Sequence, residues 1–156
     1  MHYLVATDAD YVVNDVTAAL GGPDVSFTIV REGCAVAAVV ADRTPDLVIL
    51  DLQIGSKGGM AVTMDLRLDA SAGMAPHVKV LMLLDRQADV HLAKRCAADG
   101  WLVKPYDPLT LKRAVRAALA GPVLEAAVEA AVAAPVEAAA DELSAETAEE
   151  EAPVAG

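Results

Sequence analysis

Residues 47–51 read Leu47-Val48-Ile49-Leu50-Asp51, four consecutive apolar residues followed by a carboxylate. As a β-strand, such a run is apolar on both faces, which is typical of a central parallel strand covered by helices on both sides. A similar run, Val80-Leu81-Met82-Leu83-Leu84, occurs about thirty residues later. Together the two stretches predict a parallel sheet between two layers of helices.

Outward from this stretch, short apolar runs alternate with segments in which apolar residues recur at helical spacing. The expected strands are Tyr3–Ala6, Val25–Val30, Leu47–Leu50, Val78–Leu84 and Trp101–Val103. The expected helices are Asp10–Leu20, Gly33–Asp42, Gly59–Leu68, Arg86–Ala98 and Pro108–Leu119. Five strand–helix repeats with right-handed crossovers predict a five-stranded parallel α/β domain. Ligands of such sheets gather at the carboxyl ends of the strands.

The charge of the chain is unevenly distributed and suggests two parts, a domain over residues 1–121 and a tail over residues 122–156. All 12 Lys and Arg residues lie in the first part, whereas nine of the 23 acids and no base lie in the second, which therefore carries most of the net charge of −11. Gly121-Pro122 ends the last expected helix. Beyond it, an Ala/Glu/Pro-rich composition predicts a tail that is helical over Val123–Ala134 or disordered. An acidic tail is repelled by phosphate backbones, so no nucleic-acid partner is expected.

Two further observations bear on the location of the protein. No apolar run approaches the length of a membrane span, and the first residues lack a basic segment ahead of an apolar one. We therefore expect a cytoplasmic protein with no membrane partner. Cys34 and Cys96 have no CxxC or Cys/His spacing, which predicts buried reduced thiols rather than a disulfide or a zinc site.

Three charged residues fall at the ends of apolar strands. Asp8 follows the first expected strand, Asp51 follows Leu50, and Lys104 follows Val103. In a parallel sheet these three side chains converge at one edge. Two carboxylates and an ammonium group there suit a hard divalent cation and a phosphoryl group, because Mg²⁺ prefers oxygen ligands and lysine supplies a compact positive charge.

Two of these segments resemble the receiver domain of bacterial response regulators. Residues 47–55, with Gly59 four residues on, resemble the phosphoacceptor segment of that family. Residues 98–106 resemble its fifth-strand segment, which contains a Lys-Pro pair. The resemblance covers about residues 2–120. It implies a flavodoxin-like receiver fold of the single-domain, chemotaxis-regulator kind, and a cis bond between Lys104 and Pro105.

The resemblance also implies roles for individual residues. Asp51 would be the phosphoacceptor, a nucleophile assisted by bound Mg²⁺ and a lysine that neutralise charge on the transferring group. Asp8, Asp51 and the backbone carbonyl of Gln53 would bind the Mg²⁺. Lys104 would contact a phosphoryl oxygen, and Trp101 occupies the position of the switch aromatic. No enzymatic turnover of a separate substrate is implied, because such a domain transfers a phosphoryl group only to itself.

Four positions depart from the pattern of the family. Thr7 replaces the first of two adjacent acids, which predicts weakened Mg²⁺ binding. Leu84 replaces a Ser or Thr whose hydroxyl bonds a phosphoryl oxygen, so the usual link to Trp101 is missing. Asp85 adds a negative charge there, and Gly55 replaces a typical proline. These departures predict a degenerate receiver, one that is phosphorylated slowly or works by binding alone.

Two alternatives follow from the same residues. Thr7 and Leu84 favour a pseudo-receiver, the same fold used as a binding or dimerisation module without phosphorylation. The segment Asp8-Ala9-Asp10-Tyr11-Val12 instead fits the DxDx(T/V) signature of haloacid-dehalogenase-type phosphatases, with Asp8 as nucleophile. Those enzymes need a later pair of acids, usually downstream of a lysine, but after Lys104 only Asp107 precedes the tail.

The expected partners are those of the resembling family. They are a sensor histidine kinase or a phosphotransfer protein as phosphoryl donor, and a separate effector, because no helix-turn-helix or basic domain follows residue 121. In receivers, partners or a second protomer dock on the fourth helix, fifth strand and fifth helix. A homodimer through the last helix is therefore a further expectation. This helix also carries a basic stripe, Lys112, Arg113 and Arg116.

Overall fold

The computed structural model describes residues 1–121. The predicted tail, with its expected helix over residues 123–134, lies outside the described residues. The elements in chain order are β1 (His2–Ala6), α1 (Asp10–Leu20), β2 (Ser26–Val30), η1 (Gly33–Ala35), α2 (Val36–Asp42), β3 (Leu47–Asp51), α3 (Gly59–Ser71), β4 (Lys79–Leu84), η2 (Gln87–Asp89), α4 (Val90–Arg95), β5 (Gly100–Val103) and α5 (Pro108–Ala120).

The five strands form one parallel sheet in the order β2-β1-β3-β4-β5. β3 lies at its centre, where Ile49 pairs with Val5 of β1 on one side and with Leu81 of β4 on the other. Every residue of β3 is buried, as the uninterrupted apolar run predicted. The structure confirms the expected five-stranded parallel sheet.

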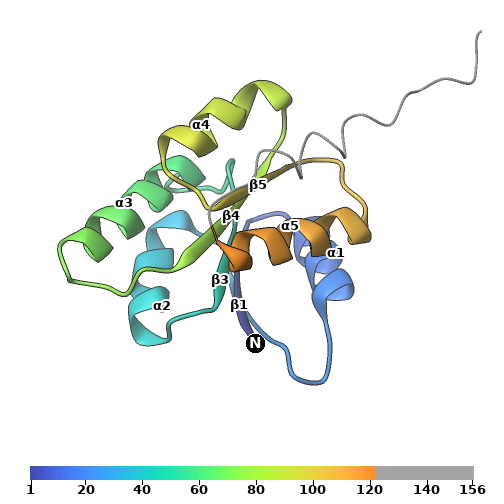
Figure 1. Cartoon of the computed structure of the whole chain (residues 1–156), viewed down its shortest axis with the longest axis horizontal. Helices are drawn as coiled ribbons and strands as arrows, with labels where there is room; N and C mark the ends of the chain where they lie inside the picture. The colour runs from blue at the N-terminus through green and yellow to red at the C-terminus, as the bar shows by residue number, and fades with distance from the viewer. Residues whose placement is uncertain (122–156) are drawn as a thin grey trace, which may run out of the picture.

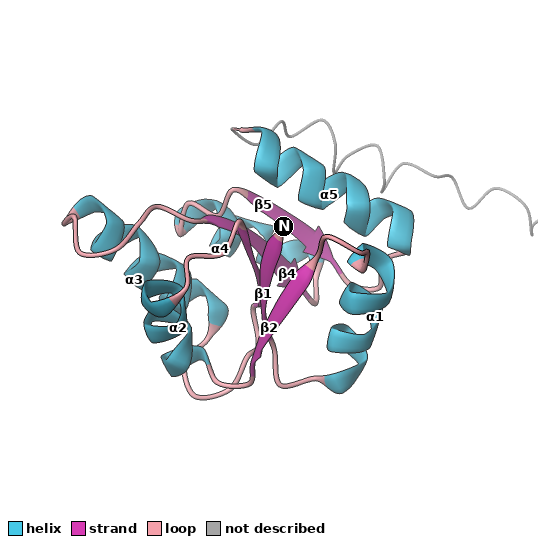
Figure 2. Ribbon diagram, turned by 90° about the horizontal axis from the view of Figure 1, so that it is seen from below, coloured by secondary structure: helices cyan, strands magenta, loops and turns pink. Residues whose placement is uncertain are grey.

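Helices cover both faces of the sheet. Helices α1 and α5 lie side by side on one face, and α2, α3 and α4 lie on the other (Figures 1 and 2). Successive residues of a strand point to opposite faces, so Ile49 packs with α1 and α5, whereas Val48 and Leu50 pack with α2 and α3. Sequential strand–helix units thus build two apolar layers around one sheet.

The predicted strands and the last helix differ from those observed by one residue at an end, whereas three predicted helices differ more. The segment predicted as one helix over Gly33–Asp42 begins as a 3₁₀ turn and is α-helical only from Val36. The predicted helix Arg86–Ala98 likewise contains a 3₁₀ turn and ends at Arg95, because Ala97 has a left-handed φ of 56° that ends the helix. Helix α3 extends to Ser71, three residues beyond the predicted end.

The two cysteines differ in their surroundings. Neither forms a disulfide, and Cys96 is buried as expected. Cys34 is exposed, so the prediction of two buried thiols is wrong for this residue. It lies in the 3₁₀ turn after β2, where its Sγ faces the carboxylate of Glu32 at 3.5 Å rather than the core.

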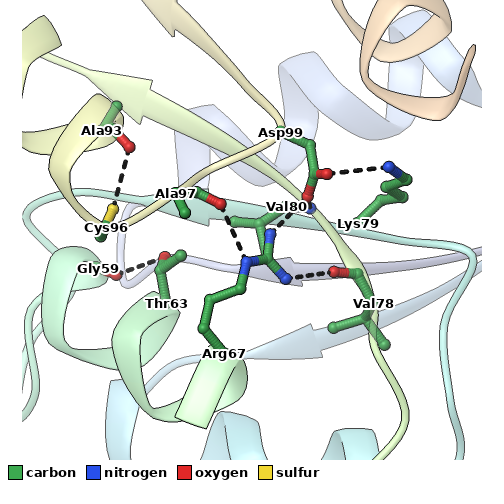
Figure 3. A network of polar contacts seen from close by, with 10 residues as sticks. All are labelled: Gly59, Thr63, Arg67, Val78, Lys79, Val80, Ala93, Cys96, Ala97 and Asp99. Atoms are coloured by element: carbon green, nitrogen blue, oxygen red, sulfur yellow. Dashed lines mark hydrogen bonds and ion pairs between the residues drawn. The ribbon is translucent and has the colours of Figure 1, made fainter. Parts of the chain in front are cut away.

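A half-buried ion network joins α3 to the edge of the sheet that faces away from the carboxyl ends of the strands (Figure 3). Arg67 of α3 donates to the carbonyl oxygens of Ala97 and Val78 at 3.0 and 2.8 Å and pairs with Asp99. Lys79, the first residue of β4, pairs with the same carboxylate at 3.0 Å. These contacts fix α3 against the starts of β4 and β5.

Within residues 1–121, no helix has both the length and the hydropathy that a membrane span requires.

Candidate functional site

The carboxyl ends of the strands bring together residues that are far apart in sequence. Asp51 is the last residue of β3, Thr7 and Asp8 follow β1, and Lys104 follows β5. The strand order reverses direction between β1 and β3, and a parallel sheet opens a crevice at such a point. Asp51 lies at this switch point, where the topology favours a ligand site.

Asp51 is the buried centre of the site. Its side chain is 3% exposed. The carboxylate accepts hydrogen bonds from the Thr7 hydroxyl at 3.0 Å and from the backbone N–H of Gln53 at 3.2 Å. The ammonium group of Lys104 lies 3.2 Å from both carboxylate oxygens. A buried charge needs such partners, because removing an unpaired carboxylate from water is costly.

Lys104 has a second carboxylate partner. Its Nζ lies 2.9 Å from Oδ1 of Asp85, the residue that follows β4. Burial lowers the pKa of the Lys104 ammonium, but the hydrogen bond and charge of Asp85 and the charge of Asp51 outweigh burial, so the net shift is upward. The ammonium group therefore stays charged between two carboxylates.

The backbone around Lys104 matches the expectation from the motif. Its N–H donates to the carbonyl of Leu84 at 2.7 Å, which joins the chain after β5 to the end of β4. The peptide bond between Lys104 and Pro105 is cis, as predicted. The lysine side chain is thereby brought to the edge where β3 and β4 end.

Asp8 lies at the mouth of the site rather than inside it. Its side chain is exposed, and its backbone carbonyl accepts a hydrogen bond from Arg31 at 3.4 Å. The carboxylate lies beside the loop after β3, because a Cβ built on Gly55 would be 3.4 Å from Asp8 Oδ2. The Asp8 carboxylate and the loop after β3 are thus neighbours at the carboxyl ends of the strands.

The first turn of α3 packs unusually close to the site. A Cβ on Gly59 would lie 2.6 Å from the backbone oxygen of Asp51, a distance that real side chains do not tolerate. Glycine at this position lets the helix begin directly beneath the loop after β3. The Gly59 that the sequence motif singled out is therefore required by packing.

The oxygen atoms at this edge suit Mg²⁺ in kind. Asp8 and Asp51 supply carboxylates and Gln53 a backbone carbonyl, all of them hard oxygen ligands. Where a second acid would stand, Thr7 instead accepts a hydrogen bond from the N–H of Ala9 and donates one to Asp51. Within residues 1–121, no group of three or more His, Cys, Asp and Glu side chains is arranged to hold a metal. Two acids and a carbonyl are few protein ligands, a number compatible with Mg²⁺ because this ion usually keeps several waters.

Leu84 and Trp101 lie together in the apolar cluster between the sheet and α4. Leu84 is fully buried and packs with Trp101, Met82 and Cys96 on the α4 face of the sheet. The Trp101 side chain is 6% exposed, and the ammonium of Lys94 lies 5.5 Å from its ring centroid. The structure therefore brings Asp51 and Lys104 into contact, whereas Trp101 belongs to the packing between the sheet and α4.

Sequence reasoning missed two features of the site. It treated Thr7 only as a missing acid, although the hydroxyl bonds the carboxylate of Asp51. It treated Asp85 only as an added negative charge, although this side chain pairs with Lys104. Asp85 directly follows an apolar strand. Asp8, Asp51 and Lys104 were selected because they lie at or just after the ends of such strands, so the same criterion would have selected Asp85.

The fold and the site define a class of protein. It is a doubly wound parallel α/β domain with a buried carboxylate–lysine pair at the switch point of the sheet. The family described as the response regulator receiver domain matches residues 3–116, and the chain belongs to this family. It is thus a receiver domain of two-component signalling.

Curated relatives agree with this assignment. The chain is 30% identical over 118 residues to the DNA-binding response regulator MtrA of Mycobacterium tuberculosis, a match covering 74% of this chain and 49% of the relative. It is 32% identical over 84 residues to the protein PilH of Pseudomonas aeruginosa, covering 54% of this chain and 69% of the relative. The chain spans about half the length of the MtrA proteins that it matches.

Solved structures show the same fold. The BeF3-activated N-terminal receiver domain of Klebsiella pneumoniae RstA is 26% identical, with a TM-score of 0.66 over 78% of this chain and 100% of that one. The chemotaxis response regulator CheY4 of Vibrio cholerae is 22% identical, with a TM-score of 0.66 over 76% of this chain and 98% of that one. The expected flavodoxin-like receiver fold is confirmed.

Proposed function

We propose that this receiver domain accepts a phosphoryl group on Asp51 in the presence of Mg²⁺ and passes the signal on through protein–protein contacts. The observation that carries the proposal is the position of the Lys104 ammonium, 3.2 Å from both oxygens of Asp51. A fixed positive charge beside a buried carboxylate stabilises the negative charge of a transferring phosphoryl group.

The covalent step uses one oxygen of Asp51 as nucleophile. A new bond forms between this oxygen and phosphorus, and the bond from phosphorus to the donor's leaving group breaks, with the electron pair departing on the leaving group. Lys104 keeps its proton and contacts a phosphoryl oxygen. The Thr7 hydroxyl, which donates to Oδ2, holds the carboxylate in place.

Asp8, Asp51 and the backbone carbonyl of Gln53 are the groups that would hold Mg²⁺. When bound, the ion would supply a second positive charge that neutralises oxygens of the transferring group. Thr7 offers a hydroxyl instead of a third carboxylate, so a lower affinity for Mg²⁺ is part of the proposal.

The proposed donor is a sensor histidine kinase or a phosphotransfer protein, and the proposed receiver of the signal is a separate effector. The exposed face of α5 carries Lys112, Arg113 and Arg116 and is the proposed surface for an effector or a second protomer. A cytoplasmic location is part of this proposal and is supported by two free cysteines, one of them exposed.

The test is the intact mass of the protein after incubation with Mg²⁺ and acetyl phosphate. We expect a gain of one phosphoryl group, absent in Asp51→Asn, which keeps the shape of the side chain but removes its nucleophilic charge. Asp24→Asn is the matched control, since Asp24 is exposed near the start of β2, at the opposite edge of the sheet. Equal labelling of Asp51→Asn and the wild type would contradict the proposal.

A second candidate function is a pseudo-receiver that binds partners without phosphorylation. The specific observation in its favour is the burial of Leu84, which places an apolar side chain where a hydroxyl would be needed to link phosphate to Trp101. The same experiment separates the two, because a pseudo-receiver gains no mass under any concentration of donor. The phosphatase alternative lacks its acid pair, since the only acid after Lys104 in residues 1–121 is Asp107, which caps α5.

A further inference from the structure

Asp85 has a place in the site that the proposed function does not explain. The Lys104 ammonium bridges two carboxylates, with Asp51 at 3.2 Å and Asp85 at 2.9 Å. The two differ in their exposure to water, since the side chain of Asp51 is 3% exposed and that of Asp85 is 39% exposed. Asp85 is therefore the outer, more exposed partner of the lysine.

The charge balance of this triad opposes an incoming phosphoryl group. Two carboxylates and one ammonium leave a net negative charge before any metal is bound, and the donor's oxygens add more. Like charges within a few ångströms repel strongly in a partly buried site, where water screens them less than in solution. The lysine that should attract the phosphoryl oxygens is already neutralised by Asp85.

We propose that Asp85 is a built-in competitor for Lys104, a positioning residue that limits how fast the domain accepts a phosphoryl group. This inference rests on the proposed function of Asp51 and names its regulation. In the resting protein Asp85 holds Lys104. During transfer, Lys104 exchanges the Asp85 carboxylate for a phosphoryl oxygen while the bond from Asp51 to phosphorus forms and the bond to the leaving group breaks.

The exposure of Asp85 makes this exchange feasible. A carboxylate that is more than one third exposed can be solvated by water when its ion pair opens, so the pair can open without leaving a buried, unsolvated charge on Asp85. The carboxylate of Asp51 cannot be solvated in this way, because its side chain is buried and depends on Thr7, Gln53 and Lys104 for hydrogen bonds. Lys104 therefore releases the outer carboxylate and keeps the inner one.

The experiment measures the rate of labelling of Asp51 by acetyl phosphate and Mg²⁺, followed by intact mass, in four proteins of full length. They are the wild type, Asp85→Asn, Asp85→Glu and the distant control Asp24→Asn. We expect Asp85→Asn to be labelled about five to thirty times faster than the wild type, the change produced by one or two kcal/mol. Asp85→Glu keeps a negative charge beside Lys104, and Asp24→Asn leaves the Lys104–Asp85 ion pair intact. Both variants should therefore be labelled at the wild-type rate.

The outcomes separate this inference from the proposed function. If the wild type is labelled and Asp85→Asn is no faster, the competitor role is refuted while the phosphoacceptor role stands. If only Asp85→Asn is labelled, Asp85 blocks the site and the wild type is not a phosphoacceptor. Absence of label from both proteins refutes both proposals. Equal acceleration by Asp24→Asn would assign the effect to net charge and overturn the role of Asp85.

Discussion

At the residue scale, Asp51 is stabilised by two different kinds of donor. The Thr7 hydroxyl is a neutral donor that fixes one oxygen, whereas the Lys104 ammonium is a charged donor that reaches both. Both donors bond the same carboxylate, but only the lysine brings a full opposite charge to it. Lys104 therefore supplies most of the electrostatic support, and Thr7 supplies orientation.

Tyr106, two residues after Lys104, has a buried hydroxyl without a hydrogen-bond partner among residues 1–121. Burial and then the charge of Asp15 raise the pKa of this phenol to about 12. From about pH 10 upward the unfolded chain loses the phenolic proton first, so the stabilising contribution is complete below pH 10 and declines up to about pH 12.

Tyr106→Phe removes this titration and the unpaired hydroxyl. At pH 7 we expect the variant to be at least as stable as the wild type, because no hydrogen bond is lost. Between pH 9 and pH 11 the wild type should lose more unfolding free energy than the variant, by about 1 kcal/mol or less after solvent screening. Urea unfolding at both pH values measures this difference, and parallel declines of the two proteins would disprove it.

At the element scale, helix α5 is defined by its first turn. Asp107 is the N-cap, and its Oδ1 accepts from the N–H groups of Leu109 and Thr110 at 2.9 and 3.0 Å. Pro108 follows in the first helical position, where its missing N–H costs nothing. α5 packs Leu111 and Val115 onto the sheet, so the cap secures a helix that covers half of one face.

Asp107→Ala should lower the melting temperature at pH 7, because two N–H groups of α5 lose their acceptor. The hydrogen bonds from the Thr110 hydroxyl and N–H lower the pKa of Asp107, so its contribution is present above about pH 4 and is lost as the pH falls below that value. The difference in melting temperature between the wild type and Asp107→Ala should therefore be smaller at pH 3 than at pH 7. Asp107→Asn, which keeps an acceptor, is the control; a gap that is independent of pH would contradict the charge argument.

At the scale of the whole molecule, the carboxyl ends and the amino ends of the strands carry different groups of charged residues. The carboxyl edge carries the acidic site, whereas the opposite edge carries the network of Arg67, Asp99 and Lys79 (Figure 3). Arg67 is 17% and Asp99 12% exposed, so both charges depend on their partners. The ion pairs that stabilise the fold are thereby separated from the charges proposed to act in phosphoryl transfer.

Arg67→Ala should lower the unfolding free energy by roughly 2–4 kcal/mol, because it leaves the largely buried Asp99 with only Lys79 and the N–H of Val80, and two carbonyl oxygens without the Arg67 donor. Arg113→Ala on the exposed face of α5 is the matched control and should change stability by less than about 0.5 kcal/mol. Urea unfolding at pH 7 measures the unfolding free energies of the two variants and of the wild type. Similar values for the two variants would show that the network contributes little.

The sequence by itself determined the strand–helix alternation and two members of the site. Short uninterrupted apolar runs rich in β-branched residues, such as residues 47–50, favour strands buried on both faces. Asp51 and Lys104 directly follow such runs, and parallel strands bring their ends to one edge. The element ends were predicted less well, since 3₁₀ turns such as Gly33–Ala35 and the left-handed Ala97 depend on local hydrogen bonding that apolar spacing does not report.

Only the tertiary structure decided how the charges and hydroxyls of the site are paired. The Thr7–Asp51 bond joins residues 44 positions apart, and the Lys104–Asp51 pair joins residues 53 positions apart. Whether Lys104 bonds one carboxylate or bridges to Asp85 depends on ångström distances set by the register of β3, β4 and β5. The physical reason is that the spacing of apolar residues along the chain already indicates which side chains are buried, whereas a hydrogen bond requires that distant strands are packed together.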